Sequence, residues 1–179
     1  MERSTGYSGR PGRTSENGPV ISRVLQSSHT DRWYQVLSET MAYMSRTVVI
    51  VGGGRVGRHT AEALVEQRSS VTVIERDAGK CATLANRQVG RVIEGDGTDG
   101  NVLQQADLEA ADVVAALTND TRANVVVCGL TREIAPEVRT LARVAQDGER
   151  DYQHLGDVDD VVYPAGAGAE IAVDRIREH

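Results

Sequence analysis

The sequence predicts an α/β protein: a doubly wound, parallel, six-stranded Rossmann sheet in a single domain, preceded by a disordered N-terminal tail. Three observations predict it. The β-branched run Thr47–Val51 ends in Gly-x-Gly-x-x-Gly at 52–57 and then enters a helical pattern. Short apolar runs alternate with helical patterns along the rest of the chain, which predicts parallel strands joined by right-handed crossovers. The 179 residues suffice for one domain with a proper core and hardly for two.

The first expected strand and the glycine loop after it show the pattern of a nucleotide-binding turn. A strand buried on both faces reads as a continuous Val/Ile run. In the loop, Gly52 permits a sharp turn, Gly54 leaves room for a pyrophosphate and Gly57 lets the next helix pack closely. That helix directs free N–H groups and the positive end of its dipole at the phosphates. Glu75 follows Gly57 by 18 residues, close to where such folds place the carboxylate that binds ribose hydroxyls. The stretch therefore predicts nucleotide binding.

The remaining elements follow from periodicity and turn residues. We expect helices over 56–67, 77–86, 101–106, 121–133, 149–155 and 166–177, and strands over 71–74, 91–94, 112–117, 138–142 and 161–163. Asp77 is a candidate N-cap, Thr118–Asp120 caps the helix over 121–133, and Pro164 ends the last strand. The glycine-rich run 165–169 is either a hinge or an ordinary loop and helix start. In such sheets a ligand lies off the carboxyl ends of the strands, where the glycine loop, Glu75, Asp96 and Thr118–Asp120 converge.

Composition excludes several classes of protein. The net charge of −6 argues against nucleic-acid binding, which needs a basic face. Aromatic residues make up 3% and Phe is absent, so the core must be Val, Leu, Ile and Ala. Cys81 and Cys128 fall in expected helices, with neither metal-ligand spacing nor a disulfide framework, and we expect both to be buried. No run of 18 apolar residues and no signal-peptide core occurs, which indicates a cytoplasmic protein.

Residues 1–45 form an extension distinct from the domain over 46–179. The extension is rich in Gly, Pro, Ser, Thr and Arg, a composition typical of disorder. An alternative for 31–44 is a short helix, because Trp33, Val36, Leu37 and Met41 recur at helical spacing.

Several motifs together resemble a known family. They are the stretches 50–57, 73–77, 95–99 with Leu103, 114–120 with Asn124, and 141–144. The series resembles the N-terminal nucleotide-binding half of TrkA, the RCK or KTN family that regulates potassium channels and transporters. The resemblance covers about residues 46 to 177, and its most discriminating parts are the Gly-Asp-x-Thr-Asp turn and the strand that runs into Thr-Asn-Asp.

The resemblance implies a function and a set of binding residues. Family members bind NAD(H), or in some cases ATP or ADP, as a ligand that is not consumed, and they work as dimers or larger rings beside a membrane pore. It implies that this chain is a homo-oligomeric regulatory subunit, peripheral to the inner face of the membrane, with a potassium channel or transporter as its partner. Gly52, Gly54 and Gly57 would hold the phosphates, Arg55 would reach an outer phosphate, Glu75 would hold the adenosine ribose, Asp96 and Thr98 would lie near the adenine, and Asn119 near the phosphate–ribose crevice. The full expected set is Gly52, Gly53, Gly54, Arg55, Val56, Gly57, Glu75, Arg76, Asp96, Gly97, Thr98, Thr118 and Asn119.

The alternative is an NAD-dependent oxidoreductase or a fragment of one. Hydride transfer usually needs a positioned acid or base and a substrate pocket. No Tyr-x-x-x-Lys pair occurs, and His59 and His154 lie outside the strand-end motifs, so no catalytic or metal-binding residue is expected. Two features depart from the family. The chain stops where a second ligand-binding domain would begin, and Ala165–Gly166–Ala167 replaces an acidic residue after the proline. We expect a regulator and no enzyme.

Overall fold

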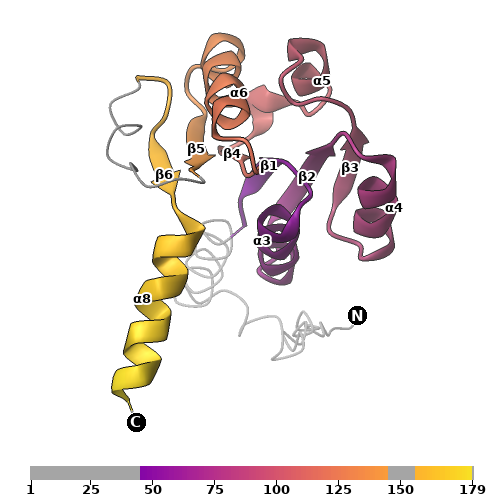
Figure 1. Ribbon diagram of the computed structural model, residues 1–179. Coiled ribbons are helices and arrows are strands. Elements are labelled where there is room, and N and C mark those ends of the chain that lie inside the picture. Colours follow the sequence, from indigo (N-terminus) through magenta and orange to yellow (C-terminus); the bar gives the residue numbers. More distant parts are fainter. Residues whose placement is uncertain (1–44, 145–155, 179) are drawn as a thin grey trace, which may run out of the picture. The chain divides into compact units, whose positions relative to one another are not determined.

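A computed structural model describes residues 45–144 and 156–178. It contains a six-stranded sheet in the order β3-β2-β1-β4-β5-β6, with every neighbouring pair parallel. The strands are β1 (Thr47–Val51), β2 (Ser70–Glu75), β3 (Arg91–Glu94), β4 (Val113–Ala116), β5 (Arg139–Arg143) and β6 (Asp160–Val162). The predicted doubly wound, six-stranded Rossmann sheet is confirmed (Figure 1). The expected extension, except for its last residue Ser45, and the expected helix over 149–155 lie outside the described residues.

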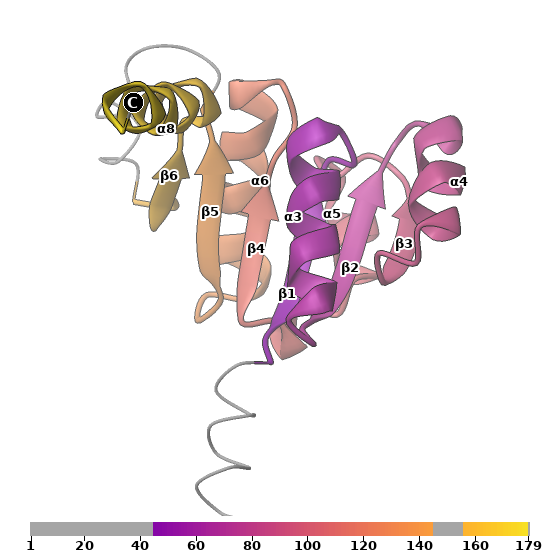
Figure 2. The same ribbon diagram turned by 90° about the horizontal axis from the view of Figure 1, so that it is seen from below.

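Helices cover both faces of the sheet (Figure 1, Figure 2). One face carries α3 (Arg55–Glu66) and α4 (Ala78–Asn86), and the other carries α5 (Gly100–Gln104) and α6 (Thr121–Ile134). β1 shows why its sequence is apolar throughout: Val48 and Ile50 pack in the core under α3 and α4, whereas Val49 and Val51 pack in the core under α5 and α6. A central strand of a parallel sheet buries both of its faces in this way.

The strand order creates a crevice beside β1. From β1 the chain winds outward through β2 to β3, then returns to place β4 on the other side of β1. The connections therefore leave β1 and β4 toward opposite faces, and the carboxyl ends of these two strands form the switch point where doubly wound sheets bind ligands.

Element boundaries differ from expectation mainly at the C-terminus. The last helix, α8 (Pro164–Arg177), begins at Pro164 and not at residue 166, so the glycine-rich run lies within its first turns. Proline suits this position because the first helical residue has no intrahelical N–H bond to lose and needs the φ that proline already has. A short 3₁₀ helix (Leu108–Ala110) is present where the sequence pattern predicts no element. Cys81 and Cys128 are both buried, as expected.

Candidate nucleotide-binding site

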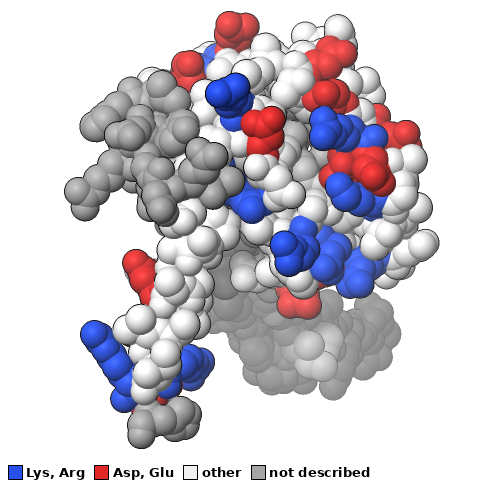
Figure 3. Space-filling view, viewed as in Figure 1, with Lys and Arg blue, Asp and Glu red and all other residues white. Residues whose placement is uncertain are grey.

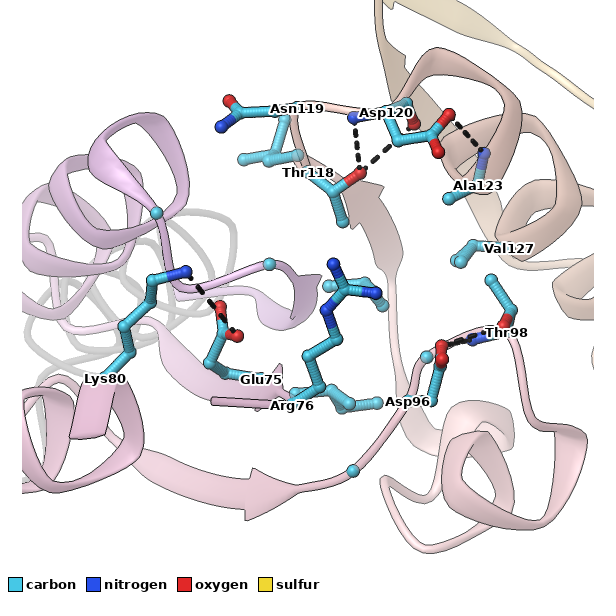
Figure 4. Close-up of a pocket in the computed structure, with 17 residues that line it drawn as sticks. Glu75, Arg76, Lys80, Asp96, Thr98, Thr118, Asn119, Asp120, Ala123 and Val127 are labelled. Carbon is cyan, nitrogen blue, oxygen red and sulfur yellow. Dashed lines mark hydrogen bonds and ion pairs between the residues drawn. The ribbon is translucent and has the colours of Figure 1, made fainter. Parts of the chain in front are cut away.

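A cleft of about 280 Å³ opens at the carboxyl ends of β1, β2, β3 and β4 (Figure 4). Of the thirteen expected residues, nine line it, namely Gly52, Gly54, Glu75, Arg76, Asp96, Gly97, Thr98, Thr118 and Asn119. The other four lie around it. Gly53 and Gly57 are buried, Val56 is partly buried against the core under α3, and Arg55 is exposed on the first turn of α3.

The glycine loop separates three geometric roles. Gly52 has φ +105°, a conformation that L side chains rarely adopt, as the chain turns off β1. A Cβ at Gly57 would collide with the carbonyl oxygen of Gly52, so only glycine lets α3 approach the strand this closely. A Cβ at Gly54 would meet nothing within 4 Å, and the space over this residue is open.

The start of α3 is the part of the loop best suited to an anion. Its N-cap is Gly54, which supplies no side-chain cap, and its first turn holds no acidic residue. In contrast, Asp77 caps α4 and Asp120 caps α6 through side-chain oxygens. The first N–H groups of a helix have no intrahelical partner and attract anions, so α3 presents uncapped donors to the open space over Gly54.

Glu75 does more than end β2. Its carboxylate is 6% exposed: Oε2 accepts the Gly53 N–H at 2.7 Å, and Oε1 accepts the Asp77 N–H at 2.9 Å. It thereby ties the glycine loop to the start of α4. Lys80 Nζ lies 4.0 Å from Oε1, at the rim (Figure 4). A carboxylate has about four lone-pair sites, so these bonds leave capacity for ribose hydroxyls.

The turn after β3 fixes a second carboxylate. Asp96 Oδ1 accepts the Thr98 N–H at 2.9 Å and the Thr98 hydroxyl at 2.7 Å. These two hydrogen bonds, assisted by the charge of Arg76, lower the pKa of Asp96 below its usual 3.8. The group is therefore ionised at neutral pH. Arg76 extends into the cleft from the end of β2 (Figure 4).

The loop after β4 is held by two residues outside the expected binding set. Asn124 is fully buried on α6 and makes four bonds: Oδ1 accepts the Thr118 N–H (3.0 Å) and hydroxyl (2.7 Å), and Nδ2 donates to the carbonyls of Thr118 (3.2 Å) and Arg143 (2.8 Å). Arg143, at the end of β5, donates to Thr118 O at 3.3 Å and to Asn119 Oδ1 at 2.6 Å. The sequence holds a clue to Asn124, because it is a polar residue on the apolar stripe of its helix with Val127 and Cys128.

Comparison with known proteins identifies the family. A sequence model of the TrkA-N domain matches residues 48–164. The chain belongs to the TrkA-N family. It is 39% identical over 124 residues to a Trk system potassium uptake protein TrkA homolog of Methanothermobacter thermautotrophicus, covering 68% of this chain and 56% of the relative. It is 34% identical over 103 residues to the TrkA homolog of Pyrococcus abyssi, covering 58% of this chain and 45% of the relative.

Solved structures show the same fold. The NAD(P)-binding domain of an exopolyphosphatase-related protein from Archaeoglobus fulgidus superposes with a TM-score of 0.66 at 19% identity, over 75% of this chain and 99% of that one. The GsuK channel bound to NAD superposes with a TM-score of 0.58 at 20% identity, over 66% of this chain and 21% of that one. At these identities the likeness establishes the fold alone. This TrkA-N chain spans about half the length of the two curated relatives above.

Proposed function

We propose that the chain is a regulatory subunit of a potassium channel or transporter, and that it binds NAD(H) or an adenine nucleotide through the thirteen residues named from the sequence. One observation carries the nucleotide proposal: the uncapped start of α3 opens over Gly54, directly beside the buried carboxylate of Glu75. The first feature suits a phosphate and the second a ribose. The names of the relatives, Trk system potassium uptake protein TrkA homologs, support the link to potassium transport.

The ligand class follows from the shared half of the candidate molecules. NAD, ATP and ADP all contain an adenosine joined to phosphates, which the proposed site would recognise. Among fold neighbours, the GsuK channel has been solved bound to NAD and bound to ADP. Glu75 disfavours NADP, because its carboxylate would repel a 2′-phosphate. Arg76 works against this preference, since a neighbouring arginine can accommodate that phosphate.

A regulator fits the cleft better than a dehydrogenase. Among the residues that the structure describes, no His, Tyr or Cys lines the cleft. His59 lies on the surface of α3, where its ring is 3.2 Å from Glu62. Hydride transfer usually requires a general acid or base within reach of the reacting carbonyl. Glu75 and Asp96 do line the cleft, but their carboxylates already accept hydrogen bonds from the protein, so we assign them to ligand binding and not to proton transfer.

The terminal helix supports assembly into homo-oligomers. α8 has no buried residue, and Val173 and Ile176 are 45% and 76% exposed. One stripe of this helix is apolar, because its residues follow the helical repeat: Ala165, Ala169, Ala172, Val173 and Ile176. Much of this helix is drawn uncharged in Figure 3. We propose that the stripe packs against a second copy, and that nucleotide shifts the population between dimer geometries.

The proposed location is the cytoplasmic face of the membrane, beside the transport protein. No helix in the described part of the chain is long and apolar enough to cross a bilayer. The face shown in Figure 3 mixes acidic and basic groups, whereas a nucleic-acid partner would favour one broad basic surface.

Calorimetry with NAD, NADH, NADP, ATP and ADP tests the nucleotide proposal directly. We expect binding either of NAD and NADH or of ATP and ADP, and we expect NADP to bind more weakly than NAD. A chain that binds none of the five is not a nucleotide-dependent regulator. Light scattering with and without the tightest ligand tests the assembly: a strict monomer at high micromolar concentration, unchanged by ligand, contradicts it.

A further inference from the structure

We propose that Arg143 is a positioning residue for the ligand: it sets the side-chain amide of Asn119 so that the amide presents only hydrogen-bond donors to the cleft. The inference rests on the nucleotide site proposed above. It begins from the contact between Arg143 and Asn119 Oδ1, which at 2.6 Å is the shorter of the two hydrogen bonds this guanidinium makes around the loop after β4.

The chemistry of the pair fixes the orientation of the amide. A guanidinium carries five donors and no acceptor, whereas an amide has an acceptor oxygen and a donor nitrogen. Asn119 must therefore turn its oxygen to Arg143 and leave both N–H groups of Nδ2 for other partners. In Figure 4 the nitrogen of this amide lies below the oxygen, on the side of Glu75 and Lys80. Without Arg143, the amide could turn over and present an oxygen, which would repel a phosphate.

Contacts on both sides of Arg143 hold its backbone in place. Arg143 is the last residue of β5. This strand pairs with β4 up to Ala142 and with β6 at Arg143 itself, and the Arg143 carbonyl accepts a 2.8 Å bond from the buried Asn124. The same Asn124 amide accepts the N–H and the hydroxyl of Thr118 and donates to the Thr118 carbonyl. One buried amide thus locks the end of β5 to the start of the cleft loop, and the guanidinium starts from a rigid base.

The same strand offers a matched control. Arg139 lies four residues earlier on β5, and its side chain also makes a short bond, from Nε to Asp160 Oδ2 at 2.6 Å. Its partner is on β6, and Arg139 does not line the cleft. Arg139→Met and Arg143→Met each remove one guanidinium from one strand, and only the second alters Asn119.

The experiment is a set of nucleotide affinities measured by calorimetry at one salt concentration, with NADH and ATP as probes, on the full chain and its variants. We expect Arg143→Met to weaken binding about tenfold, the loss typical of one bond to a charged group. Arg143→Lys, which keeps a cationic donor, should recover part of this loss, and Arg139→Met should bind like the wild type. Asn119→Asp should keep the bond to Arg143 but lose affinity, because it offers the phosphates acceptors instead of donors.

A double-mutant cycle separates positioning from a general electrostatic effect. If Arg143 acts through Asn119, Arg143→Met should cost little in an Asn119→Ala background, because coupled residues do not lose affinity additively. Additive losses, wild-type affinity in Arg143→Met, or wild-type affinity in Asn119→Asp would each overturn the inference. If Arg143→Met does not fold, as judged by thermal unfolding, the Asn119→Asp result decides. A wild-type chain that binds neither probe removes the proposed function and this inference together, whereas a binding wild type with unaffected variants removes the inference alone.

Discussion

Gly54→Val should separate nucleotide binding from stability. Gly54 has φ −68° and ψ −170°, an extended conformation open to any residue, and an added Cβ would meet nothing within 4 Å. Replacing an N-cap glycine by an apolar residue costs some tenths of a kcal/mol up to about 1 kcal/mol. Replacing glycine also lowers the conformational entropy of the unfolded chain, which stabilises the folded state by about 0.4–1 kcal/mol. The free energy of unfolding should therefore change by less than about 0.5 kcal/mol.

The affinity should change far more. The valine side chain would occupy the open space through which a phosphate must reach the first N–H groups of α3. Losing one hydrogen bond to a charged group costs about 1.5–3 kcal/mol, which corresponds to at least about a tenfold weaker Kd. Calorimetry with NADH and with ATP, and thermal unfolding of the same sample, measure the two quantities.

Gly57→Ala is the control, because its Cβ would collide with the carbonyl oxygen of Gly52. Overpacking against side chains destabilises a protein by about 1–3 kcal/mol. A backbone carbonyl can move away less easily than a side chain, so the Tm of this variant should fall clearly. Wild-type nucleotide affinity in Gly54→Val would contradict the role given to the open space over Gly54. A fall in Tm as large as that of Gly57→Ala would show that Gly54 is needed for stability and not for binding alone.

Three further predictions test other parts of the site. NAD should bind at least about tenfold more tightly than NADP, about 1.4 kcal/mol, and equal affinities would remove the role given to Glu75. Hydrogen bonds from Thr98 lower the pKa of Asp96, so the ionised carboxylate contributes fully to the free energy of unfolding above its usual pKa of 3.8 and loses this contribution as the pH falls through the folded-state pKa. In acid titration, Asp96→Asn should therefore lose less stability in that range than the wild type. An equal loss in both proteins would contradict this. Burial raises the pKa of Cys128 to about 12, so the folded chain should resist thiol alkylation at Cys128 at pH 8 and react after unfolding, whereas rapid labelling of the native chain would show that Cys128 is accessible.

The sequence alone is enough for the features that depend on residues close together in the chain. A β-branched run followed by Gly-x-Gly-x-x-Gly predicts a buried strand and a tight turn, because each property belongs to a few consecutive residues. The N-caps of α4 and α6 are predictable for the same reason, and Asp77 and Asp120 do accept the first N–H groups of those helices. The local pattern places the start of α8 two residues late, since it does not show that Pro164 occupies the first helical position.

Only the tertiary structure decided how distant residues share the cleft. The sequence predicts that Glu75 faces the ribose, yet its oxygens also hold the Gly53 and Asp77 N–H groups, which requires β2 to end beside the glycine loop. Arg143 meets Asn119 because β5 lies next to β4 in the sheet, an order that no local pattern specifies. Hydrogen bonds between residues 24 positions apart depend on strand order and register, which are set by packing of the whole sheet. Composition and periodicity therefore predicted which strands and turns would form, and the assembled sheet determined which side chains could act together.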